Sequence, residues 1–247
     1  MYHGFGRRPA AADPFNLFVS IEDLERQLRF LTRTMYPLDL PEYLERRRRS
    51  RLSPRSFLLT IDDGYTSTLE LAAPLVARYG VPALLFVCPG LLGGTSAWMP
   101  EMPGERLLTA EQVAELPRYG IEVGVHGMDH RLLPGMPADD LRHQVADARA
   151  ALADLLGRAP RAFAYPEGRF DEAAKRAVIE AGYRAAFSVG EGRGRYAITR
   201  QAINTRDSMV TFAAKLFPGW ERVERLGVGR PWMRRLGARV LRQRSLG

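Results

Sequence analysis

Residues 57–64 read FLLTIDDG, a short apolar run that passes directly into two aspartates and a glycine. The apolar part, Phe57 to Ile61, is typical of a buried strand. Asp62 and Asp63 follow it, and burial of two adjacent carboxylates is unfavourable unless a cation offsets their repulsion. Gly64 allows the tight turn that aims both side chains at one point. The alternative interpretation is an ordinary Asp-Gly turn.

A second apolar run ends in a comparable way. Ile121 to Val125 leads into His126-Gly-Met-Asp-His130. Two histidines four residues apart can converge on one ion, and neutral imidazole is a good zinc ligand. Gly127 favours a loop for this segment, and a pair of surface histidines is the alternative. One aspartate with two histidines forms a three-ligand set with open positions, as in catalytic zinc sites, and leaves the second aspartate free to act as a base.

Apolar runs of similar length recur along the chain and alternate with helical patterns. The predicted strands are residues 57–61, 83–87, 121–125, 163–165 and 185–189. Capping residues indicate helix starts at Ser20, Thr109 and Asp171. An apolar stripe from Leu141 to Leu155 has helical spacing and is interpreted as facing the core, with no chemistry on it. This alternation predicts an α/β fold with parallel strands, in which chemistry lies where strands end.

The composition is that of a globular protein: 247 residues, 46% hydrophobic and 26% charged. No apolar stretch of about 18 residues predicts a transmembrane helix, and the first residues contain no apolar region typical of a signal peptide. A single cysteine, Cys88, fits a reducing compartment. We therefore expect a location in the cytoplasm or at the periphery of the cytoplasmic membrane, although only Met1 precedes Tyr2 and the natural start could lie upstream.

The net charge is +8, and the arginines that carry it are clustered. One cluster is Arg46 to Arg51, and the other lies in residues 218–247, where apolar periodicity fades. We predict a barrel domain over residues 1–217 and a basic, amphipathic tail beyond it. The tail would suit an anionic membrane surface, with a partner groove or a folded-back helix as alternatives. No nucleic-acid motif or aromatic platform is present, so no nucleic-acid partner is expected.

The combination of motifs resembles the polysaccharide deacetylase family, also called the NodB-homology family, over roughly residues 2–205. The three segments that carry the resemblance are Thr60–Gly64, His126–His130 and Phe163–Gly168. The resemblance implies a distorted (β/α) barrel. It also implies that Asp63, His126 and His130 bind one divalent metal ion, expected to be Zn²⁺, and that Asp62 is the general base. The backbone N–H of Tyr65 would stabilise the oxyanion, and Tyr165 and Pro166 would shape the substrate groove.

The chain departs from the common family pattern at several positions. A Leu-x-His motif normally supplies the general acid, but no histidine follows His143 here. Instead the chain opens with Tyr2-His3, which resembles a circularly permuted branch that includes poly-N-acetylglucosamine deacetylases. His3 is therefore the expected general acid, with a disordered terminal histidine as the alternative. Ala164 stands where an arginine is common, so we expect Arg200 to hold the base, with a surface arginine as the alternative.

The expected function is the metal-dependent hydrolysis of an N-acetyl amide on an amino-sugar glycan or glycolipid, which releases acetate. Alternatives are the hydrolysis of a small non-sugar amide, and a catalytically silent carbohydrate-binding or membrane-associated protein. Glu167 and Gly190 also differ from the residues usual in the family, so the substrate contacts are not inferred from it.

Overall fold

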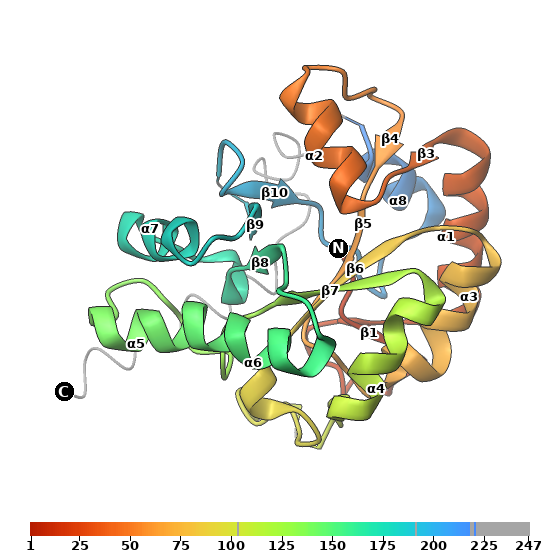
Figure 1. The fold of residues 1–247 in the computed structure, drawn as a ribbon. Coiled ribbons are helices and arrows are strands. Elements are labelled where there is room, and N and C mark those ends of the chain that lie inside the picture. Colours follow the sequence, from red (N-terminus) through yellow and green to blue (C-terminus); the bar gives the residue numbers. More distant parts are fainter. Residues whose placement is uncertain (103, 191, 218–219, 221–247) are drawn as a thin grey trace. The chain divides into compact units, whose positions relative to one another are not determined.

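The structure is a computed structural model that describes residues 1–102, 104–190, 192–217 and 220 (Figure 1). The chain divides into two compact units, Met1–Asp207 and Ser208–Gly247. The second unit contains helix α8, Met209–Lys215. The predicted basic tail of residues 218–247 lies outside the described residues, except for Trp220.

The first unit is built around a six-stranded, fully parallel sheet in the order β10-β9-β8-β7-β6-β5, which curls into a half-barrel (Figure 1). Its strands are β5 (Leu59–Ile61), β6 (Ala83–Val87), β7 (Ile121–Val125), β8 (Ala162–Ala164), β9 (Ala185–Val189) and β10 (Ile198–Arg200). The predicted α/β fold with a distorted barrel is therefore confirmed. The first predicted strand is divided, because Ser56–Phe57 (β4) pairs with Tyr36–Pro37 (β3) in a separate two-stranded sheet.

The N-terminal residues lie across the open side of this half-barrel. The Tyr2 N–H donates to the Thr60 carbonyl at 2.9 Å, and the Asp62 N–H donates to the Tyr2 carbonyl at 2.9 Å. On the other side, the Ile203 N–H donates to the Met1 carbonyl at 2.9 Å. The first two residues thus connect the β5 edge with the segment that follows β10. His3 consequently lies beside the end of β5, next to the position of Asp62.

Helices cover the outside of the sheet (Figure 1). They are α1 (Ile21–Thr34), α2 (Leu40–Arg48), α3 (Ala73–Arg78), α4 (Ala110–Glu115), α5 (Ala138–Arg142), α6 (Ala148–Leu156) and α7 (Glu172–Glu180). The predicted helix starts are confirmed: Ser20, Thr109 and Asp171 each accept a hydrogen bond from the backbone N–H three residues later. Between α5 and α6 the helix widens into a π-helical turn, His143–Asp147.

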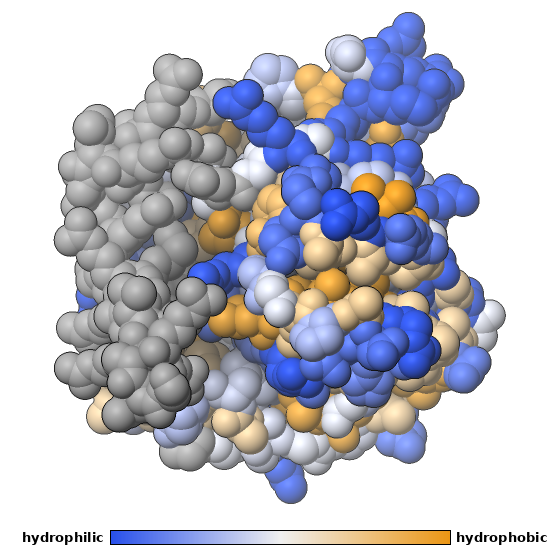
Figure 2. All heavy atoms as spheres, turned by 90° about the vertical axis from the view of Figure 1, so that its left-hand side faces the viewer, coloured by the Kyte–Doolittle hydropathy of each residue, from blue (hydrophilic) through white to orange (hydrophobic). Residues whose placement is uncertain are grey.

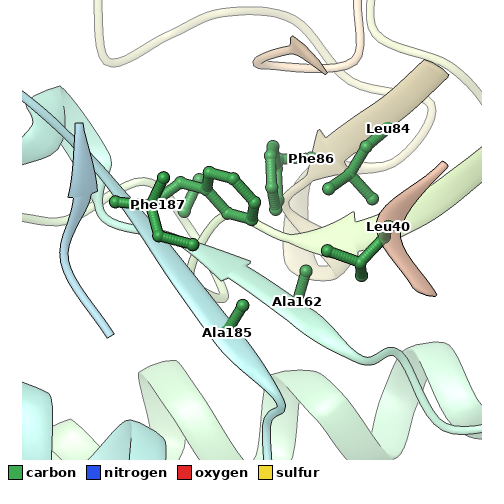
Figure 3. Packing of buried hydrophobic residues seen from close by; sticks show 8 residues of the cluster. Leu40, Leu84, Phe86, Ala162, Ala185 and Phe187 are labelled. Atoms are coloured by element: carbon green, nitrogen blue, oxygen red, sulfur yellow. The ribbon is translucent and has the colours of Figure 1, made fainter. Parts of the chain in front are cut away.

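Aromatic and small side chains alternate inside the curled sheet. Phe86 of β6 and Phe187 of β9 lie with ring centroids 5.4 Å apart (Figure 3). The cluster around them consists of Leu40, Leu84, Ala162, Ala164, Ala185 and Ile198. Small residues on β8 leave room for the two rings, as does the one glycine of β7, since a Cβ at Gly124 would approach Phe86 to 2.7 Å. These rings pack inside the sheet, below the carboxyl ends of its strands.

On the face drawn in Figure 2, hydrophilic residues gather toward the top and the edge, and hydrophobic residues lie among them across the middle. Along the described chain, no helix combines the length and the hydropathy that a membrane span requires.

Candidate active site

The predicted metal ligands come together at the carboxyl edge of the sheet. Asp63 follows β5 and His126 follows β7, the two strands that flank β6. The Asp63 Oδ1 atom is 3.5 Å from His126 Nε2 and 3.4 Å from His130 Nε2. One donor atom from each of the three residues lies within 4.8 Å of the other two. Because parallel strands end at one edge, residues far apart in the sequence meet there.

The chemistry of these donors fits a divalent cation. His126 Nδ1 lies 2.8 Å from the Ala164 carbonyl, which places the ring proton on Nδ1 and leaves the Nε2 lone pair facing Asp63. Burial lowers the pKa of His126 to about 4, so its ring is neutral at neutral pH. Burial also opposes ionisation of Asp63, but its hydrogen bond with His130 and the charge of His3 outweigh burial and lower its pKa. Neutral imidazole nitrogens beside a carboxylate form a suitable donor set for zinc.

Two of the three predicted ligands have a strained backbone. Asp63 has a φ of 72° and His130 has a φ of 64°. A residue with a side chain in this left-handed region typically carries about 1–3 kcal/mol of strain, and such residues cluster at functional sites. Gly64, with a φ of 78°, completes the turn after β5; a Cβ there would approach Val87 to 2.8 Å.

Asp62 is held by Arg200 in a buried, bidentate ion pair. The two nitrogen–oxygen distances are 2.6 Å and 2.8 Å, and Arg200 is only 9% exposed, which excludes the alternative of a surface arginine. The guanidinium lies over the rings of Phe86 and Phe187, at 5.3 Å and 5.8 Å from their centroids. Burial alone would raise the pKa of Asp62, but the charge and the hydrogen bonds of Arg200 outweigh burial and lower it. Asp62 is therefore a carboxylate at neutral pH.

His3 lies near the two carboxylates, because Tyr2 pairs with the end of β5. Its charge lowers the pKa of both Asp62 and Asp63, and its Nδ1 atom is buried without a hydrogen-bond partner in the described part of the chain. The hydrogen bonds of Tyr2 to β5 hold this segment in the sheet, and the Tyr2 hydroxyl donates to Gln27 Oε1 at 2.9 Å. These contacts contradict the alternative of a disordered terminal histidine. They leave an imidazole nitrogen free for a ligand.

Tyr65 lies two residues after Asp63 in the sequence. Among the described residues no acceptor is recorded for its backbone N–H, which leaves this donor available to a ligand. Its side chain is buried against Phe18, with ring centroids 5.2 Å apart. Any contact of Tyr65 with substrate would therefore come from the backbone.

The third motif, Phe163–Gly168, lies next to the site and is mostly buried. Tyr165 is fully buried, its ring stacks on Phe170 at 4.8 Å, and its hydroxyl donates to the Tyr196 carbonyl at 3.0 Å. Pro166, in the short turn Pro166–Gly168, is buried as well. Their side chains hold this turn in place instead of lining an open surface. The direct contribution of the motif to the site is the Ala164 carbonyl that orients His126.

Two residues that contact the loop His126–His130, which carries two of the predicted metal ligands, were not predicted from the sequence. The side-chain oxygen of Gln144 accepts the Met128 N–H at 2.9 Å, and its nitrogen donates to Asp129 Oδ1 at 2.6 Å. Gln144 lies in the same helical segment as the predicted 141–155 stripe but is not one of its apolar residues, and the sequence analysis did not single it out. Trp98 stacks on His130 at 4.5 Å from a loop without periodicity, so no pattern pointed to it.

Comparison with known proteins agrees with this geometry. The family model for polysaccharide deacetylase matches residues 49–186. The chain is 27% identical over 167 residues to YxkH of Bacillus subtilis (strain 168), a candidate polysaccharide deacetylase; the match spans 66% of this chain but only 56% of YxkH.

Solved structures share the fold. The Streptococcus pyogenes deacetylase PplD, in complex with acetate, aligns with a TM-score of 0.77 and 23% identity over 88% of this chain and 96% of PplD. IcaB from Ammonifex degensii aligns with a TM-score of 0.74 and 24% identity over 87% of this chain and 94% of IcaB. At these identities the likeness demonstrates a common fold.

Proposed function

This chain belongs to the polysaccharide deacetylase family, and on that premise we propose that it hydrolyses an N-acetyl amide on an amino-sugar glycan or glycolipid and releases acetate. The observation that carries the proposal is the convergence of the Asp63, His126 and His130 donor atoms beside an ionised Asp62. The donor set would hold one divalent cation, which we expect to be Zn²⁺. When bound, such a cation supplies Lewis-acid chemistry, which polarises an amide carbonyl and makes water a better nucleophile.

The residues around this site have distinct roles in the proposed reaction. Asp62 accepts a proton from the attacking water, and Arg200 keeps its carboxylate ionised and oriented. The backbone N–H of Tyr65 donates to the amide oxygen as negative charge develops on it. His3 donates a proton to the departing nitrogen. Oxygen from water is then bonded to the acetyl carbon, the carbon–nitrogen bond is broken, and acetate and a free amine result.

The direct test is acetate release by the metal-loaded protein. We would offer N-acetylglucosamine oligomers, lipid-linked N-acetylated sugars and a small non-sugar N-acetyl amide, before and after chelation and reloading with Zn²⁺. We expect acetate from a sugar substrate, loss of the activity on chelation, and its return with Zn²⁺. Release from the non-sugar amide alone would support the alternative enzyme. Metal binding without release from any of these substrates would contradict the proposal and favour a silent binding protein.

Replacement of His3 by alanine tests its role as the acid. We expect about a 10²-fold loss of turnover on the N-acetylated sugar, the low end for a general acid, because His3 is only half buried and water can partly replace it. With 4-nitrophenyl acetate, whose leaving group needs no proton, the same variant should retain most of its activity. The measurement is the ratio of the two rates in the variant and in the wild type.

The matched control for this measurement is Asp62→Asn, which should slow the hydrolysis of both substrates. An equal loss on both substrates in His3→Ala would contradict a role in protonating the leaving group.

A further inference from the structure

The two histidines of the candidate metal site are oriented in different ways. The His126 ring is fixed by its 2.8 Å contact with the Ala164 carbonyl. For His130, no such hydrogen bond of Nδ1 is recorded among the residues that the structure describes. The His130 ring instead lies face to face with the indole of Trp98, with centroids 4.5 Å apart and planes inclined by 14°. Its edge meets the His126 ring at 4.9 Å and 81°.

The backbone alone does not determine where this ring points. His130 is in the left-handed region, at the end of a loop that starts with Gly127 at a φ of 82°. The Gln144 side chain holds the loop at Met128 and Asp129, but its hydrogen bonds stop one residue before His130. A strained backbone conformation persists only where the surrounding structure holds it.

Trp98 is itself firmly placed. The two arms of its loop pair with each other, since the Ser96 N–H donates to the Glu105 carbonyl and the Leu107 N–H donates to the Gly94 carbonyl, both at 3.0 Å. Beside Trp98, the Met99 N–H donates to the Ser96 carbonyl at 3.0 Å. Ser96, two residues before Trp98, is buried. The backbone of the loop therefore positions Trp98 beside His130.

Histidines that bind metals usually donate their second ring nitrogen to an oxygen, which fixes the ring and strengthens the site. We infer that Trp98 is a positioning residue that replaces this hydrogen bond for His130: its indole face holds the imidazole so that Nε2 points at Asp63, 3.4 Å away. The inference rests on the proposed metal site and adds to it a residue outside the ligand set. Stacking restricts the orientation of the His130 ring without a hydrogen bond to its Nδ1 atom.

The test compares metal affinity in three variants of the full chain. Trp98→Ala removes the stacking surface, Trp98→Phe retains an aromatic face, and Met99→Ala is a matched control, because Met99 is the half-buried neighbour in the same loop. The Zn²⁺ affinity is measured by competition with a chromophoric chelator. Loss of an orienting contact typically weakens metal binding about 10–100-fold. We expect a loss of about 10-fold or more in Trp98→Ala, and near-wild-type affinity in Trp98→Phe and Met99→Ala.

A spectroscopic readout separates ring positioning from loop stability. With Co²⁺ in place of Zn²⁺, the visible absorption bands report the ligand geometry and should change in Trp98→Ala but not in Trp98→Phe. Unchanged affinity and spectrum in Trp98→Ala would overturn the inference. So would equal losses in Trp98→Ala and Met99→Ala, or a failure of phenylalanine to restore binding. If the wild-type protein itself binds neither metal, the proposed metal site fails and the inference fails with it, a result distinct from all the others.

Discussion

Substitution of Asp62 by asparagine is expected to lower the turnover of acetate release by about 10³–10⁴-fold and to leave the metal content unchanged. General bases typically contribute about 10²–10⁴-fold. We expect the upper part of this range because Asp62 is buried and its partner Arg200 holds it in one orientation, so a water molecule cannot easily take its place. Asparagine has nearly the same shape as aspartate but cannot accept the proton. The measurement combines kcat with elemental analysis of the same protein sample.

The counterpart of this variant is His126→Ala, which removes a predicted ligand. Because the His126 Nε2 lone pair faces Asp63, we expect this variant to lose both its metal and its activity. The pair of variants separates the base from the ligands. Near-normal turnover in Asp62→Asn would assign the base to another residue, and equal metal contents in His126→Ala and wild type would exclude His126 as a ligand.

Substitution of Arg200 by methionine is expected to lower the free energy of unfolding by about 3–5 kcal/mol at neutral pH, the range measured when one partner of a buried ion pair is removed. The expectation follows from burial: Asp62 would remain ionised or would have to take up a proton inside the protein, without the guanidinium that now donates to both of its oxygens. Methionine approximates the length of the arginine stem and would maintain packing on Phe86 and Phe187. Denaturant unfolding of metal-free protein measures the change.

A double variant tests the cause of this destabilisation. Arg200→Met combined with Asp62→Asn contains neither charge, so it should recover most of the stability that the single Arg200 variant loses. A loss below about 1 kcal/mol in Arg200→Met would show that the buried carboxylate is stabilised by other groups. A double variant no more stable than the single one would attribute the loss to packing instead of charge.

Several features of the site could be predicted from short segments of sequence. An apolar run that ends in Asp62-Asp63-Gly64 marks a strand and the residues at its carboxyl end, and Ile121 to His126 repeats this pattern. Alternation with helices implies parallel strands, and parallel strands place their carboxyl ends on one edge, so convergence of Asp63, His126 and His130 follows from local patterns. Helix caps such as Ser20 were predictable for the same reason, since the capping contact spans only three residues.

For the contacts that join distant segments, the tertiary structure decided between alternatives that the sequence left open. Arg200 is 138 residues from Asp62 in the chain, and the two meet because the sheet curls until β10 approaches β5. The amount of curl depends on side-chain packing inside the sheet, as with Phe86 and Phe187, and no periodicity in the sequence records it. The N-terminal segment with His3 closes the same gap through backbone hydrogen bonds, which carry no residue signature.

The same reasoning applies to the residues that support the ligands. Neither Gln144 nor Trp98 was singled out from the sequence, because the partners of both lie in the loop after β7, far from them in the chain. Tyr165 was expected at the groove but lies in the core, where its hydroxyl is satisfied by the Tyr196 carbonyl. The sequence alone thus determined which functional residues follow the strands. Packing determined which other side chains contact them, because these contacts join segments that are far apart in the chain and depend on how the whole domain packs.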